Sequence, residues 1–158
     1  MSLLDEFAII RRYFDKPLIT AGNSSVIEGI GDDCALLQLH NHEQLAVSTD
    51  TLVENVHFPV AAPPFLLASR ALGVSVSDLA AAGATPQGFL LALALPEADS
   101  EWLEKFSAGL GQTAAMLNIP LIGGDTTRGP LSLTLTVLGS VPAGQMLTRK
   151  GAMPGDLL

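Results

Sequence analysis

The stretch Gly29–Cys34, which reads Gly-Ile-Gly-Asp-Asp-Cys, places two adjacent carboxylates in a glycine-containing loop directly before an apolar run. A second polar stretch, Ser48–Thr51, reads Ser-Thr-Asp-Thr and closes the next apolar run. The two apolar runs, 34–39 and 45–50, flank a polar turn and are predicted to pair as an antiparallel hairpin. Residues directly opposite in such a pair lie about 5 Å apart at Cβ. The sequence therefore predicts that the two acidic stretches converge.

The register of this hairpin sets Cys34 opposite Asp50 and Asp33 opposite Thr51. Three carboxylates so close, with Asp32 included, repel one another and take up protons unless a cation lies among them. Hard oxygen ligands suit magnesium or calcium better than zinc. The sequence therefore predicts a magnesium cluster suited to phosphate chemistry. The alternative for the Asp pair is a local Asx turn at the entry to the strand.

Composition and charge narrow the class of protein. The 158 residues are 48% hydrophobic with a net charge of −8, which predicts one domain with a substantial core. Strong acidity argues against binding to nucleic acid or to anionic membranes. Cys34 is the only cysteine and cannot form an internal disulfide, as expected in a reducing compartment. The chain starts without a signal-peptide pattern, so a cytoplasmic location is expected.

Hydrophobic periodicity predicts the order helix, two strands, helix, strand, helix, two strands. This order indicates an α/β fold, an α+β sandwich with a mixed or antiparallel sheet covered by helices. An irregular connection is expected over 16–27, and the helix over 65–82 is apolar nearly all round, as if buried on most sides. The other expected elements are a helix through Phe7, Ile10 and Phe14, strands 34–39, 45–50, 89–95, 121–122 and 131–137, and a helix from an N-cap at Ser100 to Asn118.

Two further acidic positions carry open alternatives. Asp78 lies in an otherwise apolar helical stripe, where it either forms a buried ion pair with Arg70 or Arg128 or faces the metal site. Gly123-Gly124-Asp125 follows a short strand; its glycines allow backbone N–H groups to approach a phosphate while Asp125 holds the metal. A plain tight turn is the alternative for this stretch.

The remaining candidate residues carry weaker signals. His57 is either a loop histidine or a ligand contact, whereas His40 and His42 are expected to face solvent, because two histidines alone make a poor zinc site. Cys34 is expected to be a small buried residue. The sequence contains no P-loop, no complete dinucleotide-binding fingerprint and no nucleophile elbow. Phosphate bound here must therefore be held mainly through metal and backbone.

Six stretches in a fixed order resemble those of thiamine-monophosphate kinase, a member of the superfamily of aminoimidazole-ribonucleotide synthetase and selenophosphate synthetase. The resemblance implies an N-terminal domain over 1–141 whose sheet joins that of a second subunit in a barrel at a homodimer interface. It also implies that 142–158 is a linker and the start of a separate C-terminal domain. The stretches are 29–37 (GIGDDCALL), 48–52 (STDTL), 56–58 (VHF), 76–84 (VSDLAAAGA), 122–130 (IGGDTTRGP) and 148–152 (TRKGA).

The resemblance also assigns roles by position. It implies several bound magnesium ions, ATP as co-substrate and thiamine monophosphate as the phosphate acceptor. The magnesium ligands it implies are Asp33, Thr49, Asp50, Asp78 and Asp125, with Ser48 beside them; the ATP contacts are Gly124, Asp125 and Arg149; the contact to thiamine phosphate is His57.

The implied reaction is phosphorylation of thiamine monophosphate to thiamine diphosphate by in-line transfer from ATP. The attacking phosphate oxygen is largely ionised at neutral pH, since its second pKa is about 6, and no strong general base is needed. Two other functions remain open at this point. One is another ATP-dependent enzyme of the superfamily, such as a selenophosphate synthetase, although no Cys precedes Gly29 here. The other is a non-catalytic dimerisation module that binds calcium.

Overall fold

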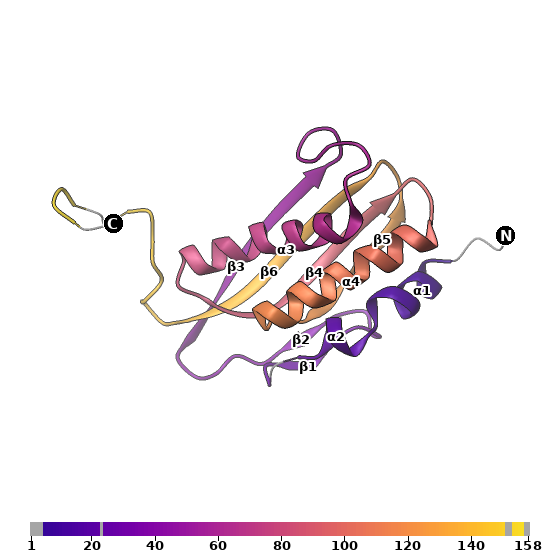
Figure 1. The fold of residues 1–158 in the computed structure, drawn as a ribbon. Helices are drawn as coiled ribbons and strands as arrows, with labels where there is room; N and C mark the ends of the chain where they lie inside the picture. The colour runs from indigo at the N-terminus through magenta and orange to yellow at the C-terminus, as the bar shows by residue number, and fades with distance from the viewer. Residues whose placement is uncertain (1–4, 23, 151–152, 157–158) are drawn as a thin grey trace.

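A four-stranded mixed sheet with two long helices on one face forms the centre of the molecule (Figure 1). The computed structural model describes residues 5–22, 24–150 and 153–156. The strand order is β3-β6-β4-β5, with β4 and β5 parallel and the other neighbours antiparallel. These strands are β3 (Glu43–Val53), β4 (Thr85–Leu95), β5 (Leu121–Arg128) and β6 (Ser132–Pro142). The predicted α/β class with a mixed sheet is confirmed.

The two long helices, α3 (Pro64–Ala81) and α4 (Ser100–Leu117), cover the sheet face that carries the buried side chains. Asp99, not Ser100, is the N-cap of α4, because its carboxylate accepts hydrogen bonds from the amides of Glu101 and Trp102. At the other end Asn118 adopts the left-handed conformation that terminates the helix, as its position predicted.

The N-terminal part of the chain packs beside α4 and the β5 edge of the sheet. The irregular connection predicted over 16–27 contains a short helix and the first strand. The elements are α1 (Glu6–Ile9), the π-helical turn η1 (Ile10–Phe14), α2 (Pro17–Thr20), β1 (Val26–Glu28) and β2 (Leu36–Leu37). The first helix is thus found where predicted.

The predicted hairpin between 34–39 and 45–50 is wrong. β2 pairs with β1 in a separate two-stranded sheet, whereas β3 pairs with β6 along its whole length. Strand β6 provides eleven residues of alternating apolar and polar character, which satisfy the backbone of β3 far more completely than the six-residue run 34–39 can. Cys34 therefore does not face Asp50, and Asp33 does not face Thr51.

The pairing of β3 with β6 assigns its polar residues to two different faces. Val137 and Leu135, opposite Ser48 and Asp50, are fully buried on the helix-covered face. Thr49 alternates with these residues and points to the opposite, uncovered face, where it bonds Thr136.

Helix α3 is less buried than its sequence predicted. Leu67, Ala68 and Leu72 pack into the core, while Leu66 and Val74 are exposed. Gly83 follows the C-cap with φ of 69°, a conformation that ends the helix where predicted. No helix within the described residues is long and apolar enough to cross a membrane.

Candidate functional site

The first group of candidate residues lies where α3 crosses the β3 edge of the sheet. Ser48 Oγ donates a hydrogen bond of 2.5 Å to Asp78 Oδ2, which joins the strand to the helix. Asp50 follows two residues along β3 on the same face. Asp78 is exposed and has no salt bridge within the described residues, so the predicted alternative of a buried ion pair is wrong. Its carboxylate remains open toward solvent and faces a small cavity.

This cavity, of about 400 Å³, also includes the chain that follows β6. Ser48 and Asp78 line it together with Arg149. A guanidinium, a carboxylate and a hydroxyl around one cavity form a mixed-charge site that suits an anion bound together with a cation. Three of the predicted site residues, distant in sequence, are therefore brought together here.

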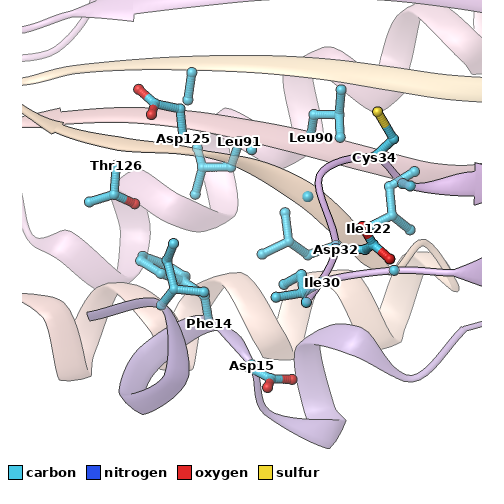
Figure 2. A pocket seen from close by; sticks show the side chains of 18 of the residues that line it. Phe14, Asp15, Ile30, Asp32, Cys34, Leu90, Leu91, Ile122, Asp125 and Thr126 are labelled. Carbon is cyan, nitrogen blue, oxygen red and sulfur yellow. The ribbon is translucent and has the colours of Figure 1, made fainter. Parts of the chain in front are cut away.

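The second group lies around a cavity of about 1090 Å³ beside β5 and beneath the N-terminal segment (Figure 2). Asp33 and Asp125 line it, as does Gly124. Its apolar lining comes from the N-terminal helices, the glycine loop and two strands. The apolar residues labelled in Figure 2 are Phe14, Ile30, Leu90, Leu91 and Ile122.

Gly124 and Asp125 belong to strand β5 and do not form the predicted turn after a short strand. Gly124 has φ of 148°, and a Cβ added to it would lie 1.9 Å from the carbonyl oxygen of Leu91. Only glycine therefore allows β5 to approach β4 this closely. The strand continues through this position and carries Asp125 to the wall of the large cavity.

Gly124→Ala is expected to destabilise the chain by about 3 kcal/mol or more, because it adds a steric clash to an unfavourable backbone conformation. Gly129→Ala is the matched control: its added Cβ would meet Ala94 Cβ at 3.6 Å, an ordinary contact, and we expect a change within about 1 kcal/mol. Urea unfolding measured for both variants tests this. Equal stability of the two variants would contradict the close approach of β5 to β4.

Thr49 lies apart from the first group and bonds Thr136, which lines the large cavity. Its hydroxyl donates to the carbonyl oxygen of Leu135 at 3.1 Å and lies 2.9 Å from Thr136 Oγ1, on the uncovered face. Thr51 and Thr134 repeat this hydroxyl pair at 2.9 Å. The Thr49 side chain is therefore engaged with β6 and lies on the opposite face from Asp50.

The two carboxylates of the glycine loop differ in their contacts. The amide of Asp33 donates to Asp32 Oδ1 at 2.7 Å, so one carboxylate of the pair stabilises the loop, close to the local-turn alternative. The Asp33 side chain has no hydrogen bond in the described part of the chain and lines the cavity. Cys34 was expected to be buried but is exposed at the same cavity, because no hairpin covers it.

His57 lies in the loop that follows β3. Its Nδ1 accepts a hydrogen bond from the Val53 amide at 3.1 Å, which leaves the proton of the neutral ring on Nε2. The ring is exposed, so Nε2–H is available as a donor to a ligand. His40 and His42 are exposed turn residues, as predicted.

The two groups lie at opposite edges of the sheet. Asp50 on β3 and Gly124 on β5 occupy one row, separated by three strand spacings of about 4.8 Å each, or roughly 14 Å. Within the described residues no three His, Cys, Asp or Glu side chains converge on a metal position. The predicted convergence of Asp33, Asp50, Asp78 and Asp125 is therefore not found within the described residues, where they form two separate groups. We call them the β3 half-site (Ser48, Asp50, Asp78, Arg149) and the β5 half-site (Asp33, Gly124, Asp125).

Some residues of the large cavity were not singled out from the sequence. Arg11 and Phe14 come from the N-terminal helices, and Thr126 and Thr134 come from two strands. The two helical residues belong to an ordinary amphipathic pattern, and the two threonines belong to an alternating strand pattern. Such patterns occur in any surface helix or half-exposed strand and do not indicate a site. Only the packing of the N-terminal segment against β5 places them together.

Comparison with known proteins identifies related chains. The family model for the N-terminal domain of AIR synthase related proteins matches residues 31–141. Thiamine-monophosphate kinase of Escherichia coli (strain K12) is 52% identical over 151 residues, which are 96% of this chain and 46% of the relative. The chain thus spans about half the length of the curated relatives it matches.

Solved structures agree with this similarity. A crystal structure of thiamine-monophosphate kinase from Stenotrophomonas maltophilia K279a aligns with a TM-score of 0.79 and 51% identity, over 85% of this chain and 42% of that chain. AaThiL complexed with AMPPCP and TMP aligns with a TM-score of 0.68 and 26% identity, over 73% of this chain and 38% of that chain.

Proposed function

Because the chain belongs to the family of AIR synthase related proteins through their N-terminal domain, we propose that it is the ATP- and magnesium-binding domain of a thiamine-monophosphate kinase. The observation that carries this proposal is 52% identity to a relative of that name across nearly the whole chain. The complex of AaThiL with AMPPCP and TMP supports ATP and thiamine monophosphate as the two substrates. A cytoplasmic location belongs to the same proposal.

The donor set of each half-site fits magnesium. Asp50 and Asp78 provide carboxylates at one half-site, and Asp33 and Asp125 provide them at the other. Magnesium in phosphoryl-transfer enzymes is commonly held by one or two carboxylates together with waters and substrate phosphates, so neither half-site needs a third protein carboxylate. When bound, the metal supplies charge neutralisation between two anionic reactants.

The chain's own residues then bind and orient the substrates. Ser48 holds the Asp78 carboxylate in one orientation through its hydrogen bond. Arg149 contributes a positive charge beside this pair for the ATP phosphates. His57 offers an Nε2–H donor to the phosphate of the acceptor. No residue is assigned as a general base, because the attacking phosphate oxygen is already ionised.

A homodimer belongs to the proposal because it explains the two half-sites. Within the described part of the chain, strands β3 and β5 are the unpaired edges of the sheet, and the uncovered face carries exposed Leu45 and Val47 beside the threonine pairs. Pairing β5 of one copy with β3 of a second copy closes an eight-stranded barrel by a two-fold axis and removes all free edges. The β5 edge of each copy, which carries Gly124 and Asp125, then lies next to the β3 edge of the second copy, which carries Ser48 and Asp50.

The test is a turnover assay together with a binding measurement. Residues 1–158, joined to the part of the Escherichia coli relative that lies beyond the match, form a fusion protein that we expect to convert thiamine monophosphate and ATP to thiamine diphosphate and ADP. Calorimetry should show that AMPPCP binding to the fusion protein requires magnesium. Binding of calcium without any response to nucleotide would favour the dimerisation module, and turnover with selenide in place of thiamine monophosphate would favour a selenophosphate synthetase.

A further inference from the structure

The chain after β6 follows a fixed path from the start of β3 to the end of α3. The Ala143 amide donates to the carbonyl oxygen of His42 at 2.8 Å, and the Gly144 amide donates to Gln44 Oε1 at 3.1 Å. The Leu147 amide then donates to the carbonyl oxygen of Ala82 at 3.0 Å. This last bond satisfies a carbonyl group at the end of α3 that the helix itself leaves without a partner.

The Leu147 side chain occupies a position that the end of α3 leaves open. Its Cδ1 and Cγ lie 3.4 Å from where a Cβ of Gly83 would be, so they pack directly over this glycine. Leu147 also lines the small cavity together with Leu79 and Ala82. The side chain is still 64% exposed, which makes this a local contact and not part of the main core.

Arg149 lies two residues beyond this contact and lines the same cavity as Ser48 and Asp78. Two residues span at most about 7 Å, so the position of Leu147 restricts where the guanidinium can lie. Within the described residues Arg149 forms no salt bridge or side-chain hydrogen bond that would hold it independently. The Thr148 hydroxyl donates to the carbonyl oxygen of Lys150 at 2.7 Å, which restrains the local turn around Arg149 but does not tie it to the rest of the fold. The contacts of Leu147 are the nearest ones that connect this turn to α3.

We propose that Leu147 is a positioning residue that anchors the chain to the end of α3 and thereby holds Arg149 at the β3 half-site. The proposal rests on the proposed function, in which Arg149 binds the phosphates of ATP. Without the anchor, the guanidinium loses its fixed approach to the Ser48–Asp78 pair and must be ordered when nucleotide binds. Loss of the anchor therefore lowers the affinity for ATP and leaves the fold intact.

The experiment is a double-mutant cycle in the fusion protein, with KM for ATP and kcat as readouts. Leu147→Ala is expected to raise KM for ATP roughly tenfold, in the range of one charge-assisted hydrogen bond, and Arg149→Ala at least as much. In the Arg149→Ala background, Leu147→Ala is expected to have no further effect, because it acts only through the arginine. Leu147→Met should restore the wild-type KM, and Met153→Ala, an exposed change in the same segment, should leave it unchanged.

Hydrogen exchange of the 158-residue chain supplies a readout that does not depend on catalysis. The Leu147 amide should be protected in the wild type and exchange faster in Leu147→Ala, while urea unfolding stays the same within about 0.5 kcal/mol. Additive effects of the two substitutions on KM, or an unprotected Leu147 amide, would overturn the role of Leu147 while leaving the kinase assignment standing. A wild-type fusion protein that neither binds nor uses ATP would overturn the proposed function and this role with it.

Discussion

Replacing Asp50 by Asn in the fusion protein is expected to lower kcat for thiamine monophosphate phosphorylation by about 10²- to 10³-fold or more. The change removes one negative charge and keeps the size of the side chain, so it weakens the proposed magnesium ligand without opening a cavity. Asp50 is half-buried on the helix-covered face of β3, two residues from the Ser48–Asp78 pair. The measurement is steady-state turnover over a range of magnesium concentrations, where the variant should need more magnesium than the wild type.

The control for this variant is Glu97→Gln, which removes a charge from an exposed residue that lines neither cavity. Its turnover should match the wild type. Urea unfolding of both variants should agree within about 1 kcal/mol, which separates a lost ligand from a lost fold. Near-normal turnover of Asp50→Asn at low magnesium would remove the β3 half-site from the mechanism.

Much of the fold could be predicted from the sequence because its long elements carry strong periodic patterns. Helices α3 and α4 and strand β6 lie close to their predicted positions, since each combines a regular apolar period with clear start or stop residues. Strand β4 was also predicted, although it begins four residues earlier than its apolar run. The first residues of β4 were not predicted as strand because they include Pro86 and Gly88, and both residue types normally interrupt a strand.

Strand pairing could not be predicted in the same way. The run 34–39 and β3 are neighbours in sequence, with a polar turn between them, which is the usual sign of a hairpin. The structure instead pairs β3 with β6, 11 residues to 11, across most of the length of the chain. A local sequence pattern does not show that a distant strand can form a longer hydrogen-bonded ladder with β3. The pairing of β3 with β6 determines where Asp33 lies relative to Asp50.

For the candidate site too, the residue types could be predicted from the sequence, but their arrangement in space could not. The residue types that suit magnesium and phosphate are recognisable along the sequence, and Ser48 and Asp78 do meet although they are 30 residues apart. Their separation from Asp125 follows from the strand order, in which β3 and β5 are the two edges. A sequence pattern that suggests one cluster thus corresponds to two groups of residues at opposite edges of the sheet.

A mixture of two inactive variants tests whether each site is shared between two copies. Asp50→Asn damages the β3 half-site and Asp125→Asn damages the β5 half-site, so each homodimer of a single variant has two damaged sites. In a mixed dimer with shared sites, one site receives both substitutions and the other receives neither. After random exchange half of the dimers are mixed and half of their sites are intact, so activity should recover to about a quarter of the wild type.

The result expected for sites contained within one copy is different. Each site of the mixed dimer then carries one substitution, and the mixture should be as inactive as the separate variants. The measurement is turnover after the two fusion proteins are unfolded together and refolded, with the separately refolded variants combined afterwards as the control. Asp50→Asn mixed with Asp78→Asn should show no recovery under either arrangement, because both substitutions lie in the β3 half-site. Recovery only in the Asp50→Asn and Asp125→Asn mixture therefore requires that β3 of one copy complete the site on β5 of another. The same result would explain why one chain alone keeps these carboxylates three strands apart.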